Sequence, residues 1–271
     1  MPVRFDANIS LLFTEVPLLE RPAAAAAQGF DAIESWWPFS AAVPEAREVD
    51  AFVRAIGDAG VRLVALNFFA GDMPAGERGI ASIPGRSAEF RDSAAVLAEI
   101  ARQTGCKLFN ALYGVRQDGV DPGLQDQVAT ENLSFAARTV SRLGGAVLIE
   151  PLAAGENGAY PLTGPSDVCR VIDRVAAQTG AANLRMLGDF YHLTRNGHAW
   201  PEIIGGYLER LGHVQIADAP GRHQPGTGEI DFPALFEALS AAGYGGYVGL
   251  EYRAEGSTED SLSWLRGGTG S

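Results

Sequence analysis

The sequence has few of the residues that form disulfides or bind soft metals. It contains two cysteines, Cys106 and Cys169, and four histidines in 271 residues. Neither cysteine belongs to a CxxC pair or to a cluster of histidines and cysteines. We therefore expect two reduced thiols, and neither a disulfide framework nor a thiolate metal site.

Positive charge and long apolar runs are also scarce. The chain has 21 Lys and Arg residues against 33 Asp and Glu, which gives a formal net charge of -12. Nucleic acids and anionic membranes attract basic surfaces, so we expect neither as the main partner. Apolar runs such as Val147–Ile149 are far shorter than the roughly 20 residues of a membrane span. The first residues lack the features of a signal peptide, so the expected location is the cytoplasm.

Short apolar runs alternate with helical stretches along the chain. Strands are expected at Phe5–Ile9, Ala32–Trp36, Arg62–Leu66, Lys107–Leu112, Ala146–Glu150, Leu184–Asp189, His213–Ala217 and Tyr247–Glu251. Helices are expected around Leu18–Gln28 and at Glu45–Ala59, Ser87–Thr104, Leu124–Leu143, Ser166–Thr179, Ile203–Leu211, Pro233–Ala242 and Thr258–Leu265. This alternation is typical of a parallel sheet covered by helices.

At this length the pattern favours a closed (β/α)8 TIM barrel, with an open doubly wound sheet as the alternative. We expect a single domain over residues 1–266 and a flexible tail at residues 267–271. No GxGxxG motif follows the first strand and no GxxxxGK[ST] motif occurs, so no nucleotide cofactor is expected.

Polar side chains end the last four expected strands, where the active sites of such barrels lie. These side chains, called the ligand set below, are Glu150, Asp189, Gln215 and Glu251. Three carboxylates in one barrel mouth would repel one another unless a cation neutralised them. Oxygen ligands favour Mg²⁺ or Mn²⁺, whereas Zn²⁺ more often recruits imidazole and is the alternative.

Other polar residues near the expected barrel mouth could bind a substrate. His192 follows Asp189 by three residues, within reach of a substrate oxygen. Arg222 follows the seventh strand and could hold a carboxylate with two parallel hydrogen bonds. The segment from Asn67 to Arg86 is long, which is typical of a lid or binding loop, and we expect Asn67 to face the substrate.

Several longer motifs resemble those of the hydroxypyruvate isomerase family, within the xylose-isomerase-like barrel superfamily. The resemblance covers the chain from Phe5 to about Leu265. The motifs are Phe5–Asn8, Ala70–Asp72, Gly76–Gly79, Pro84–Arg86, Glu89–Asp92, Ile149–Pro151, Tyr191–His192, His213–Asp218, Pro225–Ile230 and Gly249–Tyr252. The chain departs from the family pattern at Ala153, where relatives often have Asn, and at Gly188, where some have Tyr.

The resemblance implies a TIM-barrel enzyme in which the ligand set binds a divalent metal. It further implies that Glu150 and Glu251 exchange protons with the substrate, and that His192, Arg222 and Glu156 bind substrate oxygens. The implied reaction converts hydroxypyruvate to tartronate semialdehyde. A 2-oxo-tetronate isomerase or a ketose epimerase is the alternative, and a homo-oligomer is left open.

Two other classes of protein fit the sequence less well. A metal-dependent DNA endonuclease built on this barrel would need more histidines and a basic face. A sugar-acid binding protein would not need both glutamates.

Overall fold

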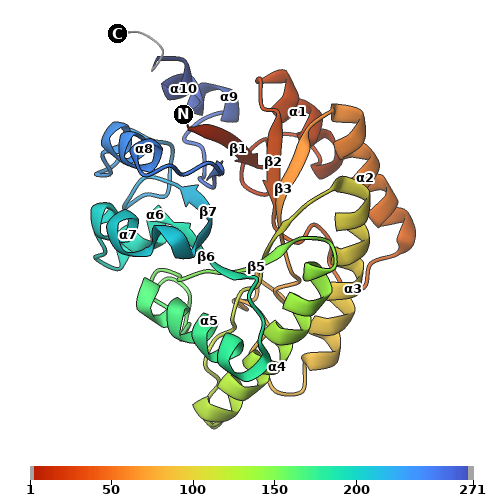
Figure 1. The fold of residues 1–271 in the computed structure, drawn as a ribbon. Helices are drawn as coiled ribbons and strands as arrows, with labels where there is room; N and C mark the ends of the chain where they lie inside the picture. The colour runs from red at the N-terminus through yellow and green to blue at the C-terminus, as the bar shows by residue number, and fades with distance from the viewer. Residues whose placement is uncertain (1–2, 268–271) are drawn as a thin grey trace.

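The computed structural model describes residues 3–267, and its strands close into a barrel surrounded by helices (Figure 1). All neighbouring strands are parallel and follow chain order, with β8 pairing back to β1. The strands are β1 (Arg4–Asn8), β2 (Ala32–Ser35), β3 (Arg62–Asn67), β4 (Leu108–Asn110), β5 (Ala146–Ile149), β6 (Leu184–Asp189), β7 (Leu211–Ile216) and β8 (Tyr247–Leu250). The predicted TIM barrel is confirmed, and the open doubly wound sheet is excluded.

The helices cover the outside of the barrel (Figure 1). They are η1 (Leu18–Glu20), α1 (Arg21–Ala27), α2 (Ala46–Ala59), α3 (Ser87–Thr104), α4 (Pro122–Ser141), α5 (Pro165–Thr179), α6 (Phe190–Arg195), α7 (Trp200–Tyr207), η2 (Leu208–Arg210), α8 (Phe232–Ala241), α9 (Thr258–Ser261) and α10 (Ser263–Gly267). Within residues 3–267, no helix combines the length and the apolar character needed to cross a bilayer.

The expected helices differ from the observed ones in three places. The alternation of strands and helices does not predict α6, a helix of six residues that starts directly after β6. The expected helix at Ile203–Leu211 ends earlier, because Leu211 already pairs with Met186 of β6. The last expected helix is interrupted between α9 and α10. Of the expected tail, Gly267 ends α10 and residues 268–271 lie outside the described part of the chain.

Apolar side chains at helical spacing attach the helices to the barrel. Helix α2 buries Val49, Phe52 and Ile56, which share one face because their spacing is three and four residues. At the end of β3, the ring of Phe68 stacks on Phe90 of α3, with centroids 5.2 Å apart. These contacts fix the strand ends, and therefore the side chains that the strands present at the barrel mouth.

Every strand presents one buried polar side chain within one residue of its C-terminal end. This polar ring consists of Asn8, Glu34, Asn67, Asn110 and the ligand set, and none of its members is more than 7% exposed. Gln215 of β7 donates a hydrogen bond to Glu34 of β2, although these strands are not neighbours in the barrel. The bond therefore crosses the barrel interior, which is where the polar ring lies.

Two glycines allow the backbone conformation of the loop after β3. At Gly71 and Gly79 the φ angles are +84° and +100°. Residues other than glycine rarely adopt such positive φ angles. A Cβ on Gly79 would also lie 2.0 Å from the carbonyl oxygen of Leu112. This loop is therefore packed tightly against the segment that follows β4.

We expect Gly79→Ala to destabilise the protein more than Gly76→Ala does. Gly76 has nearly the same φ, +101°, but nothing within 4 Å of its Cβ position, so the pair separates packing from backbone strain. The extra loss for Gly79→Ala should be about 1–3 kcal/mol, the usual cost of overpacking. The free energies of unfolding from urea titrations test this, and equal losses for both variants would contradict it.

Candidate active site

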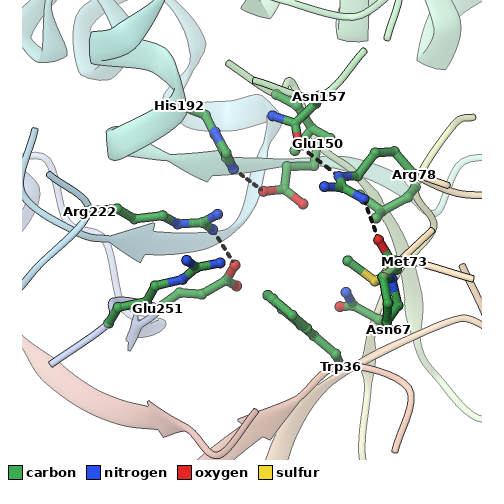
Figure 2. Close-up of a pocket in the computed structure, with 13 residues that line it drawn as sticks. Trp36, Asn67, Met73, Arg78, Glu150, Asn157, His192, Arg222 and Glu251 are labelled. Carbon is green, nitrogen blue, oxygen red and sulfur yellow. Dashed lines mark hydrogen bonds and ion pairs between the residues drawn. The ribbon is translucent and has the colours of Figure 1, made fainter. Parts of the chain in front are cut away.

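A cavity of about 270 Å³ opens at the C-terminal ends of the strands. Figure 2 shows the side chains directed into it from the barrel and from the loop after β3. The lining residues are Trp36, Asn67, Met73, Pro74, Arg78, Leu112, Glu150, Leu152, Asn157, His192, Arg222, Glu251 and Arg253. Ligand cavities usually start at roughly 300 Å³, so this one suits a small substrate.

Glu150 and Glu251 both enter this cavity, as the sequence predicts. Glu150 Oε2 accepts a hydrogen bond of 2.7 Å from Asn110 Nδ2. Glu251 Oε1 accepts one of 2.7 Å from Arg222 Nη2, and Oε2 accepts one of 3.1 Å from Asn8 Nδ2. Each carboxylate is therefore aimed by neighbours and keeps part of its surface toward the cavity.

Burial makes both glutamates hold protons more tightly than usual. Burial, together with the charge of Asp189, raises the pKa of Glu150 to about 8. Burial also raises the pKa of Glu251 well above its ordinary value, although Arg222 opposes the rise. Buried like charges at this spacing need either protons or a cation to balance them.

The other two members of the ligand set leave oxygen atoms without partners. Asp189 Oδ1 accepts a hydrogen bond of 2.8 Å from the Tyr191 backbone N–H. Its Oδ2 and the Oε1 of Gln215 are buried and have no hydrogen-bond partner within residues 3–267. Unpaired buried oxygens are costly. Two such atoms beside two buried carboxylates fit a divalent cation with oxygen ligands.

The orientation of the Gln215 amide follows from its neighbour Glu34. Gln215 Nε2 donates a hydrogen bond of 2.7 Å to Glu34 Oε1. A carboxylate can only accept, so it must face the amide nitrogen, and the amide oxygen is left for a cation. Gly249 makes room for this contact, because a Cβ there would lie 2.7 Å from the Glu34 carboxylate.

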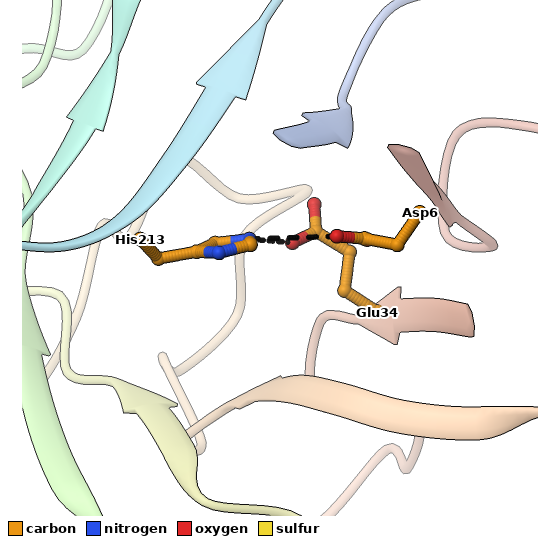
Figure 3. A group of neighbouring side chains, drawn as sticks. All are labelled: Asp6, Glu34 and His213. Atoms are coloured by element: carbon orange, nitrogen blue, oxygen red, sulfur yellow. Dashed lines mark hydrogen bonds and ion pairs between the residues drawn. The ribbon is translucent and has the colours of Figure 1, made fainter. Parts of the chain in front are cut away.

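Asp6, Glu34 and His213 form a buried ionisable cluster (Figure 3), which contacts the ligand set through the hydrogen bond between Glu34 and Gln215. Glu34 Oε2 lies 2.7 Å from His213 Nε2, and Asp6 Oδ2 lies 3.9 Å from the same nitrogen. Burial, together with the charges of Glu34 and Glu251, raises the pKa of Asp6 well above its ordinary value. Asn8 Nδ2 links the cluster to the cavity, since it donates to both Glu34 and Glu251.

His192 lies on α6, directly behind the carboxylates. Its Nδ1 accepts a hydrogen bond of 3.1 Å from the backbone N–H of Ala153, so the hydrogen of the neutral ring is on Nε2. That nitrogen lies 3.6 Å from Asp189 Oδ2 and 3.8 Å from Glu150 Oε1. Burial lowers the pKa of His192 to about 4, so the ring is neutral at ordinary pH. Ala153 contributes through its backbone, which explains how this position tolerates a small side chain.

Arg222 is presented by a loop that the carboxylate of Asp218 organises. Asp218 accepts four hydrogen bonds, from the backbone N–H groups of Ala219, Gly226, Gly228 and Ile230. Arg222 itself has a φ of 60°, an uncommon value for a residue other than glycine. Its Nη2 lies 2.7 Å from Glu251 Oε1 and 3.7 Å from Asp189 Oδ2. The guanidinium thus neutralises part of the negative charge of the ligand set.

The remaining sequence-predicted residues differ in their access to the cavity. Asn67 lines it, and its amide has no hydrogen-bond partner among residues 3–267. Glu156 does not line the cavity. Its carboxylate accepts hydrogen bonds from Tyr191 Oη at 2.8 Å and Arg195 Nε at 2.7 Å, both on α6.

Several polar residues that organise the site were not predicted from the sequence. Asn8, Glu34 and Asn110 hold the ligand set, and each ends an apolar strand in the same way as the four residues that were predicted. The rule applied to the late strands would have found them in the early strands. Arg78 lies in a long loop, and no spacing indicates that it reaches the cavity.

We expect Glu150→Gln to raise the stability of the metal-free protein. The folded-state pKa of Glu150 is about 8, above the ordinary 4.5, so this carboxyl makes stability fall as pH rises between those values. The melting temperature with EDTA should therefore rise in Glu150→Gln, more at about pH 8 than at about pH 5. The matched change at exposed Glu131 should give no such trend. A lower melting temperature of Glu150→Gln at about pH 8 would contradict this.

Binding of a divalent cation should release protons, because Glu150 and Glu251 must ionise to act as ligands. Titration calorimetry of Mn²⁺ in two buffers of different ionisation enthalpy, near neutral pH, measures the number of protons released. We also expect Mn²⁺ to raise the melting temperature. Asp189→Asn should weaken binding, whereas unchanged binding would remove Asp189 from the ligand set.

Comparison with known proteins agrees with this architecture. A family model described as xylose isomerase-like TIM barrel matches residues 22–267. A Streptomyces coelicolor protein is 50% identical over 98% of this chain and 96% of its own length. Hydroxypyruvate isomerase of Escherichia coli K12 is 36% identical over 97% of this chain and 98% of its own. The 2-oxo-tetronate isomerase of Cupriavidus necator is 36% identical over 97% of each chain.

One solved structure has a similar fold and sequence. The crystal structure named AP endonuclease, family 2, from Brucella melitensis superposes with a TM-score of 0.86, at 34% identity over 99% of both chains. The closed barrel, the family model and relatives that match over almost their full length all agree. The chain therefore belongs to the hydroxypyruvate isomerase family of xylose isomerase-like TIM barrels, which makes it an isomerase.

Proposed function

We propose that this isomerase interconverts hydroxypyruvate and tartronate semialdehyde (2-hydroxy-3-oxopropanoate). The proposal rests above all on one observation, which is that two buried glutamates, Glu150 and Glu251, enter the same small cavity. The likeness to the hydroxypyruvate isomerase of E. coli supports this choice of substrate.

The reaction moves one carbon-bound proton and one hydroxyl proton between adjacent carbons. Hydroxypyruvate loses a proton from C3 and gains one at C2, while the hydroxyl proton passes from the oxygen on C3 to the oxygen on C2. An enediolate lies between the two carbon steps. We propose that one of Glu150 and Glu251 removes the carbon proton and the other returns one, with the roles exchanged in the reverse direction. A carboxyl with a pKa of about 8, as for Glu150, can both accept and return a proton near neutral pH.

We propose that the ligand set holds Mg²⁺ or Mn²⁺, with Zn²⁺ as the alternative, because all four side chains offer oxygen. When bound, the cation would supply Lewis-acid stabilisation of the negative charge that develops on the substrate oxygens. The unpaired oxygens of Asp189 and Gln215 support this assignment.

Three further residues would hold the substrate. The neutral ring of His192 directs its Nε2–H toward the carboxylates, where it can donate to a substrate oxygen. Arg222 and the unpartnered amide of Asn67 are further donors in the cavity wall. Since Glu156 is bonded to Tyr191 and Arg195 outside the wall, we propose that it acts by positioning those residues.

The main alternative is another isomerase or epimerase reaction at the same site. The 2-oxo-tetronate isomerase of C. necator is as similar to this chain as the E. coli enzyme. DNA cleavage, which the name of the Brucella structure introduces, is disfavoured by the net charge of -12 and by the small cavity. A panel of hydroxypyruvate, 2-oxo-tetronates, ketoses and a duplex with an abasic site separates these activities.

We expect Glu251→Gln, supplied with Mn²⁺, to lose hydroxypyruvate isomerisation by about 100-fold or more in both directions, the usual contribution of a general acid or base. The same substitution at Glu131, exposed on α4 and bonded to Gln127, should leave turnover unchanged. Near-normal turnover of Glu251→Gln would remove this residue from the chemistry.

A further inference from the structure

The proposed function leaves two arginines of the cavity lining, Arg78 and Arg253, without a role, and Arg78 is the less exposed of the two. Arg78 belongs to the Gly76–Gly79 motif in the loop after β3, and it lines the cavity. Figure 2 shows it across the cavity from Arg222, with Glu150 and Glu251 between the two. Arg78 and Arg222 therefore lie on opposite sides of the cavity.

Arg78 and Arg222 differ in how their charges are balanced. Arg222 forms ion pairs with Glu251 at 2.7 Å and with Asp189 at 3.7 Å. Arg78 forms no ion pair with any residue in the range 3–267. Its partners are neutral: Nε donates to Asn157 Oδ1 at 2.9 Å, and Nη1 donates to the backbone carbonyls of Met73 and Glu77 at 3.0 and 2.8 Å.

These contacts leave Nη2 of Arg78 without a partner in the described chain, on a guanidinium that is only partly exposed. An arginine charge next to a cavity and without a counterion attracts an anion, and the planar guanidinium suits a carboxylate. The three neutral acceptors orient the group without cancelling its charge.

The loop that carries Arg78 is built to hold it in place. Glu77 Oε2 accepts a hydrogen bond of 2.6 Å from the Asp72 backbone N–H, and Glu77 Oε1 pairs with Arg86. The next residue, Gly79, packs against the Leu112 carbonyl and donates its N–H to Ala70 at 2.9 Å. A guanidinium oriented before binding loses little conformational entropy when a ligand arrives.

We propose that Arg78 binds the carboxylate of the substrate and thereby selects 2-oxo and 2-hydroxy acids over neutral ketoses. The inference rests on the proposed function, because it needs the reacting carbons between Glu150 and Glu251. The substrate would then lie with its hydroxy-carbonyl end toward the ligand set and its carboxylate toward the loop after β3.

The kinetic test compares hydroxypyruvate with dihydroxyacetone, which differs only by CH2OH in place of the carboxylate. In Arg78→Met we expect kcat/KM for hydroxypyruvate to fall by about 10- to 100-fold, as for a lost charged hydrogen bond, mostly through KM. The value for dihydroxyacetone should stay within about threefold of the wild type. Arg47→Met, which removes the same charge from an arginine 81% exposed near the start of α2, should change neither.

Asn157→Asp separates charge from loop structure. The aspartate would keep an acceptor for Arg78 Nε and would add the counterion that Arg78 lacks. It would also lose the hydrogen bond of 3.1 Å that Asn157 Nδ2 donates to the Ala153 carbonyl, so the melting temperature is measured alongside. We expect KM for hydroxypyruvate to rise and the melting temperature to hold within a few degrees. An unchanged KM would show that Arg78 acts only in holding the loop, and would overturn the inference.

A binding measurement keeps the inference independent of turnover. Trp36 lines the cavity, so its fluorescence can report glycerate binding, with glycerol as the neutral control. Glycerate affinity should fall at least about tenfold in Arg78→Met and partly recover in Arg78→Lys, which also serves if Arg78→Met does not fold. Equal glycerate affinity in wild type and variants would overturn the carboxylate site. Failure of the wild type to isomerise hydroxypyruvate would instead overturn the proposed function.

Discussion

The site depends on the electrostatic cost of placing Glu150, Asp189 and Glu251 together inside a barrel. All three are at most 4% exposed. Burial raises the pKa values of both glutamates, and repulsion from neighbouring carboxylates adds to the rise. Protons or a cation can relieve this repulsion, and Arg222 relieves part of it. Burying these carboxylates together costs free energy. The same burial gives Glu150 a pKa suited to proton transfer near neutral pH.

A second layer of polar residues keeps this arrangement in place. Asn110, Asn8 and Glu34 each bond to a member of the ligand set, and Glu34 determines which end of the Gln215 amide faces the cavity. His213 anchors Glu34 in turn. Such supporting contacts fix the orientation of the residues that would bind a metal. The site therefore includes residues below the surface of the cavity.

The two ends of the cavity are built differently. At the barrel end, Arg222 is engaged by carboxylates. At the loop end, Arg78 is oriented by neutral oxygens alone and keeps its charge available. Under the proposed function, this polarity would give a small acid one favoured orientation between the glutamates. Orientation is a large part of what an enzyme supplies to a proton transfer.

The sequence by itself determined the alternation of strands and helices and five of the eight polar strand ends, because strand periodicity and polar residues at strand ends are local features. It did not predict the short helix α6. It could not supply the amide orientation of Gln215 or the reach of Arg78, because these depend on residues distant in the chain: Glu34 and His213 are 179 positions apart, and Arg78 and Asn157 are 79 apart. Only closure of the barrel brings such pairs within hydrogen-bond distance, since no local pattern encodes which loops meet across its mouth.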